Sequence, residues 1–318
     1  MEGMQAAVRA WIRFWYQPPP TVVLDLMRIF TGMITLYVFT LYLVDLPVHW
    51  SDQGWAHLDV VQRLDPMAWP FHPLSWVPTE SWPYLVGVMG LLAATSFLLG
   101  VLPLVSGLVC ILVNLGFGHG NPAVVLGQDG LLTLALFYLS ISPCARTLTV
   151  MALRPSVVAQ RPPLRSQQVE PDHGWGLPVR ALQIHLCMLY FLSGLGHLNG
   201  EWISGRILTI PRELSLSSLM AEPTGATPLW AVAMAVALLL FEFYFPIFIW
   251  LGRWRYLVLV LAVVVHLSVG IFWDALPFNL LMLTLNLVWL RGAHGEALLH
   301  GLAALLGYNW QPAETRRR

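Results

Sequence analysis

Apolar runs long enough to cross a lipid bilayer recur along nearly the whole chain, and this feature constrains its fold most. A membrane-spanning helix needs about 20 mostly apolar residues. Hydrophobic residues make up 57% of the 318 residues and charged residues only 11%, a balance unlike that of a soluble globular domain. Because lipid offers the backbone no hydrogen-bond partners, such segments cross it as helices. The sequence therefore predicts an all-α, polytopic membrane helical bundle whose first partner is the lipid bilayer.

We expect about eight transmembrane helices, separated by glycine, proline and charged residues. Their expected ranges are 21–46, 84–100, 102–118, 129–142, 178–199, 228–251, 254–273 and 275–291. Asp129 is the expected N-cap of the fourth span. Residues 1–20 carry arginines among aromatic residues and predict an interfacial amphipathic segment, whereas 292–318 predict a short amphipathic basic tail. Residues 21–291 then form one membrane domain.

The arginines indicate the orientation. Arginine supplies all 17 basic residues, and the chain contains no lysine. With eight spans, 14 arginines fall on the side of both termini, and only Arg63, Arg206 and Arg212 fall on the other side. By the positive-inside rule both termini are cytoplasmic, and we expect an integral protein of a bacterial inner membrane with no nucleic-acid partner. The three cysteines do not indicate a disulfide framework.

Two polar regions interrupt the apolar pattern. Residues 47–83 alternate tryptophan with proline and contain His49, His57 and His72, which predicts an outer cap at the bilayer surface. These histidines lack the short fixed spacing of a zinc motif, so we predict no metal. Residues 143–178 hold several arginines and prolines and predict the main polar loop on the cytoplasmic side.

Polar residues on the expected fifth span, 178–199, define a candidate site. Gln183, Tyr190, Ser193 and His197 fall on one side of this helix. Polar side chains are costly against hydrocarbon, so this side should face other helices or a water-filled cavity. One interpretation is that the polar side only supplies hydrogen bonds between helices. The other is a binding or reactive site built around His197.

Other intramembrane polar groups complete these hypotheses. Counting about 1.5 Å per residue places Arg28 and Glu242 at similar depths near the cytoplasmic side, which predicts a structural ion pair. The same counting places Asn114, His197 and His266 further out. They predict an outer-half pocket in which histidine acts as a general base or hydrogen-bonds a lipid-like ligand. A purely structural role for His266 is the alternative.

The segment YFLSGLGHLNGEWISG resembles the HTTM (horizontally transferred transmembrane) domain, the membrane part shared with vitamin K-dependent γ-glutamyl carboxylase. Further matching pieces follow the expected order: LMRIFTG, NPAVVLGQDGLLTLALFYL, FEFYFPIFIWLGRWR and the span with His266. The resemblance covers about residues 20–291. It implies a bundle of about eight helices, which in the carboxylases holds a reduced quinone near the lumenal face.

In the carboxylases a lysine in the segment matching LGHLN deprotonates the hydroquinone, and His197 occupies that position here. The resemblance therefore implies His197 as the candidate base and a quinone or hydroquinone as the ligand. The polar side of the fifth span and the outer-half pocket indicate Tyr190, Ser193, Asn114 and His266 as the residues that bind it. Imidazole is a weaker base than an amine, with a reference pKa of about 6.5 against about 10.4. Because the chain has no lysine, we do not expect carboxylation of peptide glutamates.

Two functional hypotheses follow. The first is a quinone-linked membrane enzyme or redox accessory that binds a lipid-soluble small molecule around His197. The second is a non-catalytic membrane protein, such as an immunity-type factor, that binds a membrane protein partner through the arginine-bearing loop and the tryptophan-rich cap.

Overall fold

A computed structural model describes residues 2–17, 19–50, 74, 76, 77, 81–120, 126–150, 176–209, 227–273 and 275–305. Over these residues every regular element is helical, which confirms the all-α prediction. Most of the predicted outer cap, 47–83, and of the polar loop, 143–178, lies outside the described residues, as does the end of the tail, 306–318. The docking surfaces of the second hypothesis therefore stay predictions.

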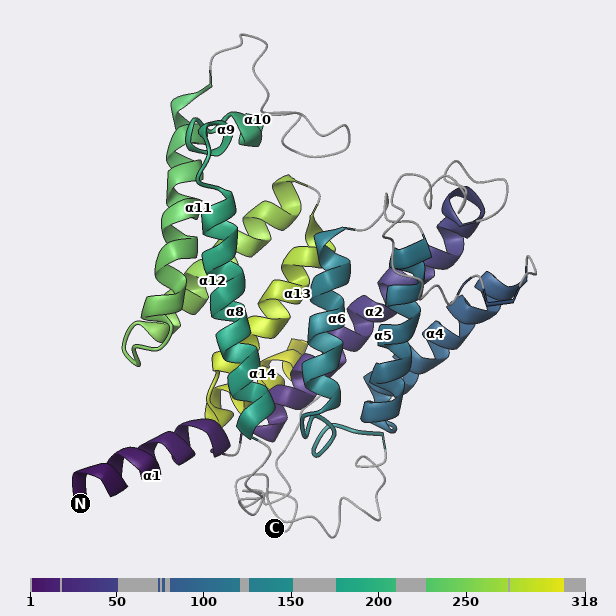
Figure 1. The fold of residues 1–318 in the computed structure, drawn as a ribbon, viewed down its shortest axis with the longest axis horizontal. Coiled ribbons are helices and arrows are strands. Elements are labelled where there is room, and N and C mark those ends of the chain that lie inside the picture. Colours follow the sequence, from purple (N-terminus) through teal and green to yellow (C-terminus); the bar gives the residue numbers. More distant parts are fainter. Residues whose placement is uncertain are drawn as a thin grey trace. The chain divides into compact units, whose positions relative to one another are not determined.

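The chain forms two compact units. The first unit, residues 1–179 and 290–318, contains α1 (Glu2–Tyr16), α2 (Thr21–His49), α4 (Trp82–Leu99), α5 (Pro103–Gly120), α6 (Gly127–Ser140) and α14 (Gly292–Leu305). The second unit, residues 180–289, contains most of α8 (Gly176–Gly196), then α9 (Gly200–Ile203), α10 (Arg206–Thr209), α11 (Leu229–Phe248), α12 (Arg255–Phe272), α13 (Leu276–Asn286) and the 3-10 helix η6 (Leu287–Trp289) (Figure 1). The predicted division at residues 20 and 291 stays a prediction.

Among the described residues, six helical segments are long and apolar enough to cross a membrane. They are Gly3–His49, which takes in α1 and α2, then Trp82–Leu99, Pro103–Gly120, Gly176–Gly196, Leu229–Phe248 and Arg255–Phe272. The other two expected spans form the shorter helices α6 and α13 with η6. The chain is therefore a membrane protein whose described regular elements are all helices, while the count of eight spans and the side of the termini stay predictions.

In the first unit, local sequence explains where the helices end. Gly100 ends α4 in the left-handed region, with φ 74°, and its N–H donates to the Phe97 carbonyl at 3.0 Å. Pro103 then begins α5, since the first turn of a helix tolerates proline. The prediction that Asp129 is the N-cap of α6 is wrong. Asp129 is the third residue of this helix, and Asp129 Oδ2 accepts the Leu126 N–H at 2.8 Å.

In the second unit, the turn segment 197–209 lies against the first half of α11. Gly205 has φ 72°, and a Cβ there would lie 2.5 Å from the carbonyl carbon of Ala231. An apolar cluster anchors the same segment, with Leu208, Ala231, Ala235 and Trp273 buried together. The end of α8 therefore contacts the second half of α11, which the turn segment 197–209 does not cover.

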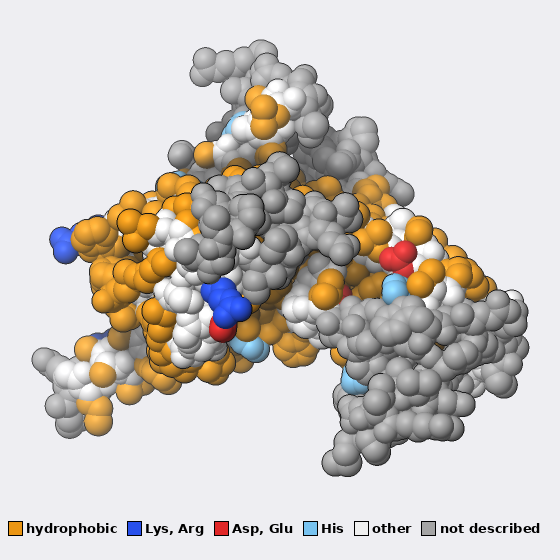
Figure 2. All heavy atoms as spheres, turned by 90° about the horizontal axis from the view of Figure 1, so that it is seen from above, with side chains coloured by type: hydrophobic (Ala, Val, Ile, Leu, Met, Phe, Trp, Pro, Cys, Tyr) orange, Lys and Arg blue, Asp and Glu red, His pale blue; other side chains and the backbone are white. Residues whose placement is uncertain are grey.

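The outer surface fits a lipid environment. In Figure 2 hydrophobic side chains cover much of the visible described surface, and charged side chains appear at only a few points. On α12 the apolar residues Val260 and Val264 are 60% and 56% exposed. Such continuous apolar exposure is unfavourable in water but matches hydrocarbon.

Candidate functional site

The candidate site is a polar cluster where the end of α8 meets α11. The Ser193 hydroxyl donates to Glu242 Oε1 at 2.8 Å, and His197 Nδ1 lies 2.7 Å from Glu242 Oε2. The His197 side chain is 32% exposed and that of Glu242 15%. Both carboxyl oxygens thus have a partner, and the histidine ring lies at the edge of the cluster.

Contact with Glu242 determines which nitrogen of the His197 ring carries the proton and which nitrogen is left as an acceptor. A carboxylate beside one ring nitrogen of histidine holds that nitrogen as the N–H and leaves the other as an acceptor. In the described part of the chain, Nε2 of His197 has no hydrogen-bond partner. His197 therefore has the arrangement of an oriented base, with its lone pair on Nε2.

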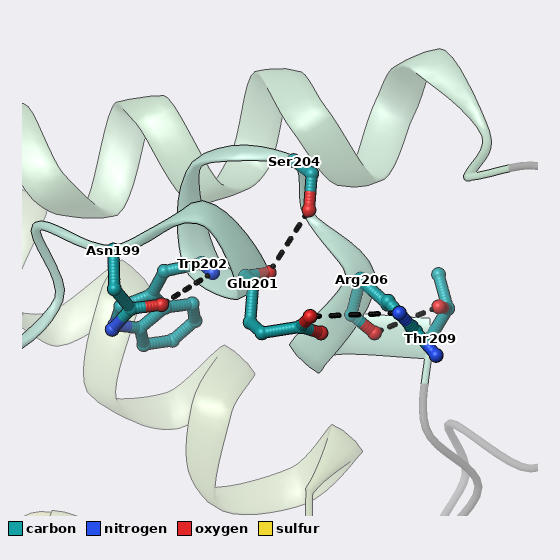
Figure 3. Close-up of polar contacts among 6 residues, drawn as sticks. All are labelled: Asn199, Glu201, Trp202, Ser204, Arg206 and Thr209. Carbon is teal, nitrogen blue, oxygen red and sulfur yellow. Dashed lines mark hydrogen bonds and ion pairs between the residues drawn. The ribbon is translucent and has the colours of Figure 1, made fainter.

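A capped turn places an indole against this imidazole. Asn199 Oδ1 accepts the Trp202 N–H at 3.0 Å and so caps α9 (Figure 3). The Trp202 ring packs edge to face on His197, with 4.0 Å between ring centroids. Its Nε1 is buried and has no partner among the described residues. The exposed Glu201–Arg206 pair in the same turn, 3.5 Å apart, lies at its surface and contributes little stability.

A second network lies deeper in the same unit. Asn286 Nδ2 lies 2.7 Å from the Tyr190 hydroxyl, which lies 2.7 Å from His266 Nε2, and His266 Nδ1 lies 2.8 Å from Asn279 Oδ1. Asn279 Nδ2 donates to the Ala275 carbonyl at 2.8 Å, so its oxygen accepts from His266 Nδ1. His266 Nε2 then accepts from Tyr190.

This network occupies both nitrogens of His266 and the Tyr190 hydroxyl. Tyr190 and His266 are 3% and 6% exposed. Asn286 Oδ1 is buried and has no partner among the described residues. The hydrogen bonds of this buried network nevertheless rigidify the helices that it joins. The structure therefore brings Tyr190 and His266 together, and Ser193 and His197 together, as two neighbouring groups. The ligand-binding role of each stays a prediction.

An apolar groove of about 540 Å³ runs between α11 and α12. Aromatic and aliphatic side chains line it, among them Met234, Phe241, Phe245 and Phe248. Phe245 stacks on Tyr190 with ring centroids 3.8 Å apart, and Phe241 contacts the same ring edge to face. The groove thus lies on the face of α11 next to the one that carries Glu242.

The remaining predicted site residues lie in the first unit. Asn114 Nδ2 donates to the Asp129 carbonyl and to Thr133 Oγ1, both at 2.9 Å. The Tyr42 hydroxyl lies 2.7 Å from Asp129 Oδ1 and 3.0 Å from Asn114 Oδ1. Asn114 therefore belongs to a network that joins α2, α5 and α6, and its predicted place in the ligand pocket stays a prediction.

Arg28 has backbone partners within its own unit. Its guanidinium donates to the carbonyl oxygens of Phe97, Leu98, Cys144 and Leu148. One turn earlier, Asp25 accepts hydrogen bonds from the backbone N–H groups of Arg146, Thr147 and Leu148 and from the Thr147 hydroxyl. The two side chains fasten the turns at 97–100 and 144–148 to α2. The predicted ion pair between Arg28 and Glu242 joins residues of different units and stays a prediction.

One part of the depth estimate is wrong. Counting from predicted helix ends placed Glu242 near the cytoplasmic side and His197 near the outer side, yet the two are hydrogen bonded. The count assumed that neighbouring helices end at the same level. Instead, the turn segment 197–209 covers the first half of α11, so α8 ends beside the second half.

Sequence reasoning missed several partners. Glu242 was assigned to Arg28, and Trp202, Asn279 and Asn286 were not identified. Asn279 and Asn286 are seven residues apart, a spacing that places both on one face of a helix and could have indicated them. Among the described residues, no group of three or more His, Cys, Asp or Glu side chains has the geometry of a metal site.

No protein-family model, no curated protein and no solved structure matches this chain. The geometry of the second unit is therefore the evidence on its function.

Proposed function

We propose that this membrane protein binds a lipid-soluble small molecule, of which a quinone or hydroquinone is the example, beside His197. The observation that carries the proposal is the His197–Glu242 contact at 2.7 Å at the edge of a membrane-length helix bundle. A carboxyl and an imidazole on apolar helices are costly to keep in lipid and mark functional sites by default. Here they are arranged to leave one imidazole nitrogen for a ligand.

Two further features support a ligand at this place. The buried Trp202 Nε1 lacks a partner among the described residues, and an unpaired buried N–H is destabilising by about 1–3 kcal/mol. A ligand oxygen would satisfy it. The groove of about 540 Å³ beside the cluster has the size and apolar lining of a small-molecule site. A molecule with a polar ring and an apolar chain fits both features.

The chemistry of the cluster is that of an oriented base. Glu242 holds the Nδ1–H of His197, and Ser193 donates to the other carboxyl oxygen. A ligand hydroxyl that donates to Nε2 would pass its proton to that nitrogen, and the carboxylate would stabilise the resulting imidazolium. Tyr190 and His266 brace the helices behind the cluster. The ligand itself would supply any redox chemistry.

Native mass spectrometry and solvent extraction of the purified protein test the proposal. We expect a lipid-soluble adduct on the wild type and on the control His300→Ala, a change at an exposed residue of α14, and its loss from His197→Ala. Glu242→Gln keeps the shape but removes the charge that orients the ring, so we expect it to retain less ligand than wild type. Equal retention by wild type and His197→Ala would remove His197 from the site.

A further inference from the structure

Helix α1 has two chemically different faces. At about 100° per residue, Met4, Val8, Trp11 and Trp15 fall within about 60° of one another, and Arg9 and Arg13 lie about 150° away from their centre. The aromatic residues pack on each other, with 5.6 Å between the ring centroids of Trp11 and Trp15. The helix is therefore amphipathic along its whole length.

The apolar face of α1 is largely exposed in the described part of the chain. Met4 is 71% exposed, Trp11 64% and Val8 51%. An exposed strip of large apolar side chains beside arginines is unfavourable in water but typical of helices that lie in the headgroup region. Tryptophan prefers this region because its ring is apolar and its N–H is polar.

The end of α1 lies where other helices of the first unit begin. A Cβ on Gly176, at the start of α8, would lie 2.6 Å from the Gln17 carbonyl oxygen. A Cβ on Gly292, at the start of α14, would lie 3.5 Å from the Pro20 side chain, and α2 begins at the next residue, Thr21. Gln17 and Pro20 are thus held at one end of the lipid-length helix α2, which places α1 at a membrane surface rather than within the bilayer.

We infer that α1 is a docking surface for anionic lipid, with its tryptophan face in the headgroup layer and Arg9 and Arg13 toward lipid phosphates. The positive charges of Arg9 and Arg13 favour anionic lipid over neutral lipid. Near such a surface each arginine contributes about a fivefold preference for the docked state. Neither arginine forms an ion pair with an acidic side chain among the described residues. This inference is independent of the proposed ligand site.

Nitrobenzoxadiazole fluorescence of the full-length protein in nanodiscs tests this inference. The dye is attached at Val8→Cys or at Ala6→Cys, which lie about 160° apart on the helix, after the native cysteines are replaced by alanine. In nanodiscs of phosphatidylcholine with phosphatidylglycerol, we expect iodide to quench the dye at residue 8 much less than at residue 6. Equal quenching at the two positions would overturn the inference.

Double variants of Arg9 and Arg13 test whether docking of α1 requires their positive charge. Arg9→Gln with Arg13→Gln should increase quenching at residue 8 in the anionic nanodiscs, and Arg9→Lys with Arg13→Lys should not. Trypsin cleavage of the unlabelled wild type after Arg9 and Arg13 gives a second measurement that needs no substitution. We expect slower cleavage in anionic than in pure phosphatidylcholine nanodiscs. Identical cleavage and quenching in both lipids would refute recognition of anionic lipid.

Discussion

Replacing Arg28 with methionine tests the account of the first unit, because methionine keeps the length and apolar stem but removes every donor. Arg28 is 0% exposed, and Nε donates to the Cys144 carbonyl at 2.7 Å. Nη1 donates to the carbonyls of Phe97, at 2.7 Å, and Leu98, while Nη2 donates to that of Leu148.

The magnitude follows from these bonds. A hydrogen bond from a charged donor contributes about 1.5–3 kcal/mol, so their simple sum is about 6–12 kcal/mol. The true loss is smaller, because the Phe97 carbonyl still accepts from the Gly100 N–H at 3.0 Å and methionine refills most of the volume. The buried Asp25 carboxylate loses its neighbouring positive charge. We expect Arg28→Met to lower the free energy of unfolding by about 3–5 kcal/mol, because buried carbonyl groups lose a charged donor.

Titration of the protein with sodium dodecyl sulfate in mixed micelles, followed by circular dichroism, measures this change. Arg206→Met is the matched control, since that side chain is 68% exposed and its loss should change the free energy by less than about 1 kcal/mol. A loss below about 1 kcal/mol for Arg28→Met would show that the two turns do not depend on the guanidinium.

Three further changes have expected outcomes. Gly205→Ala places a Cβ 2.5 Å from the α11 backbone at φ 72° and should lower the free energy of unfolding by about 2 kcal/mol, whereas Gly200→Ala, with open space around it, should have little effect. His266→Ala leaves the Tyr190 O–H without an acceptor and Asn279 Oδ1 without a donor, and it should lower the free energy of unfolding by about 2–4 kcal/mol in the same titration. Burial raises the pKa of the Cys144 thiol to about 12, so maleimide at neutral pH should not label Cys144 in the folded protein, as mass spectrometry of the peptides would show. Little change with Gly205→Ala or His266→Ala, or rapid labelling of Cys144, would contradict the packing described here.

Periodicity and segment length were sufficient to predict that the regular elements of the described residues are helices, while the count of eight spans stays a prediction. The apolar runs before Leu46 and from 228 to 273 appear as α2, α11 and α12 because backbone groups in lipid leave no alternative to a helix. The tight turn at Gly100 was also visible, since glycine and proline bracket it. Local sequence determines these features, so local reasoning finds them.

The partners of polar side chains were not predictable in the same way. Glu242 was matched to Arg28 by depth, a pairing that stays a prediction, and depth did not indicate that its oxygens contact Ser193 and His197. Depth counting treats neighbouring helices as level, whereas the offset of α8 from α11 depends on how the turn segment 197–209 packs. Arg28 was expected to need an acidic partner on another span, yet backbone carbonyls at two turns accept its hydrogen bonds. Carbonyls occur at every residue, so a sequence gives no indication of which ones a buried arginine will reach.

We propose that His197, oriented by Glu242, binds a lipid-soluble molecule. Its most direct test is the dissociation constant of decylubiquinone, in its oxidised and reduced forms, for the protein in nanodiscs. The account predicts saturable binding by wild type and by His300→Ala, and affinity about tenfold lower for His197→Ala, the effect of losing one hydrogen bond. Equal dissociation constants for wild type and His197→Ala, or no saturable binding of either form by wild type, would contradict it.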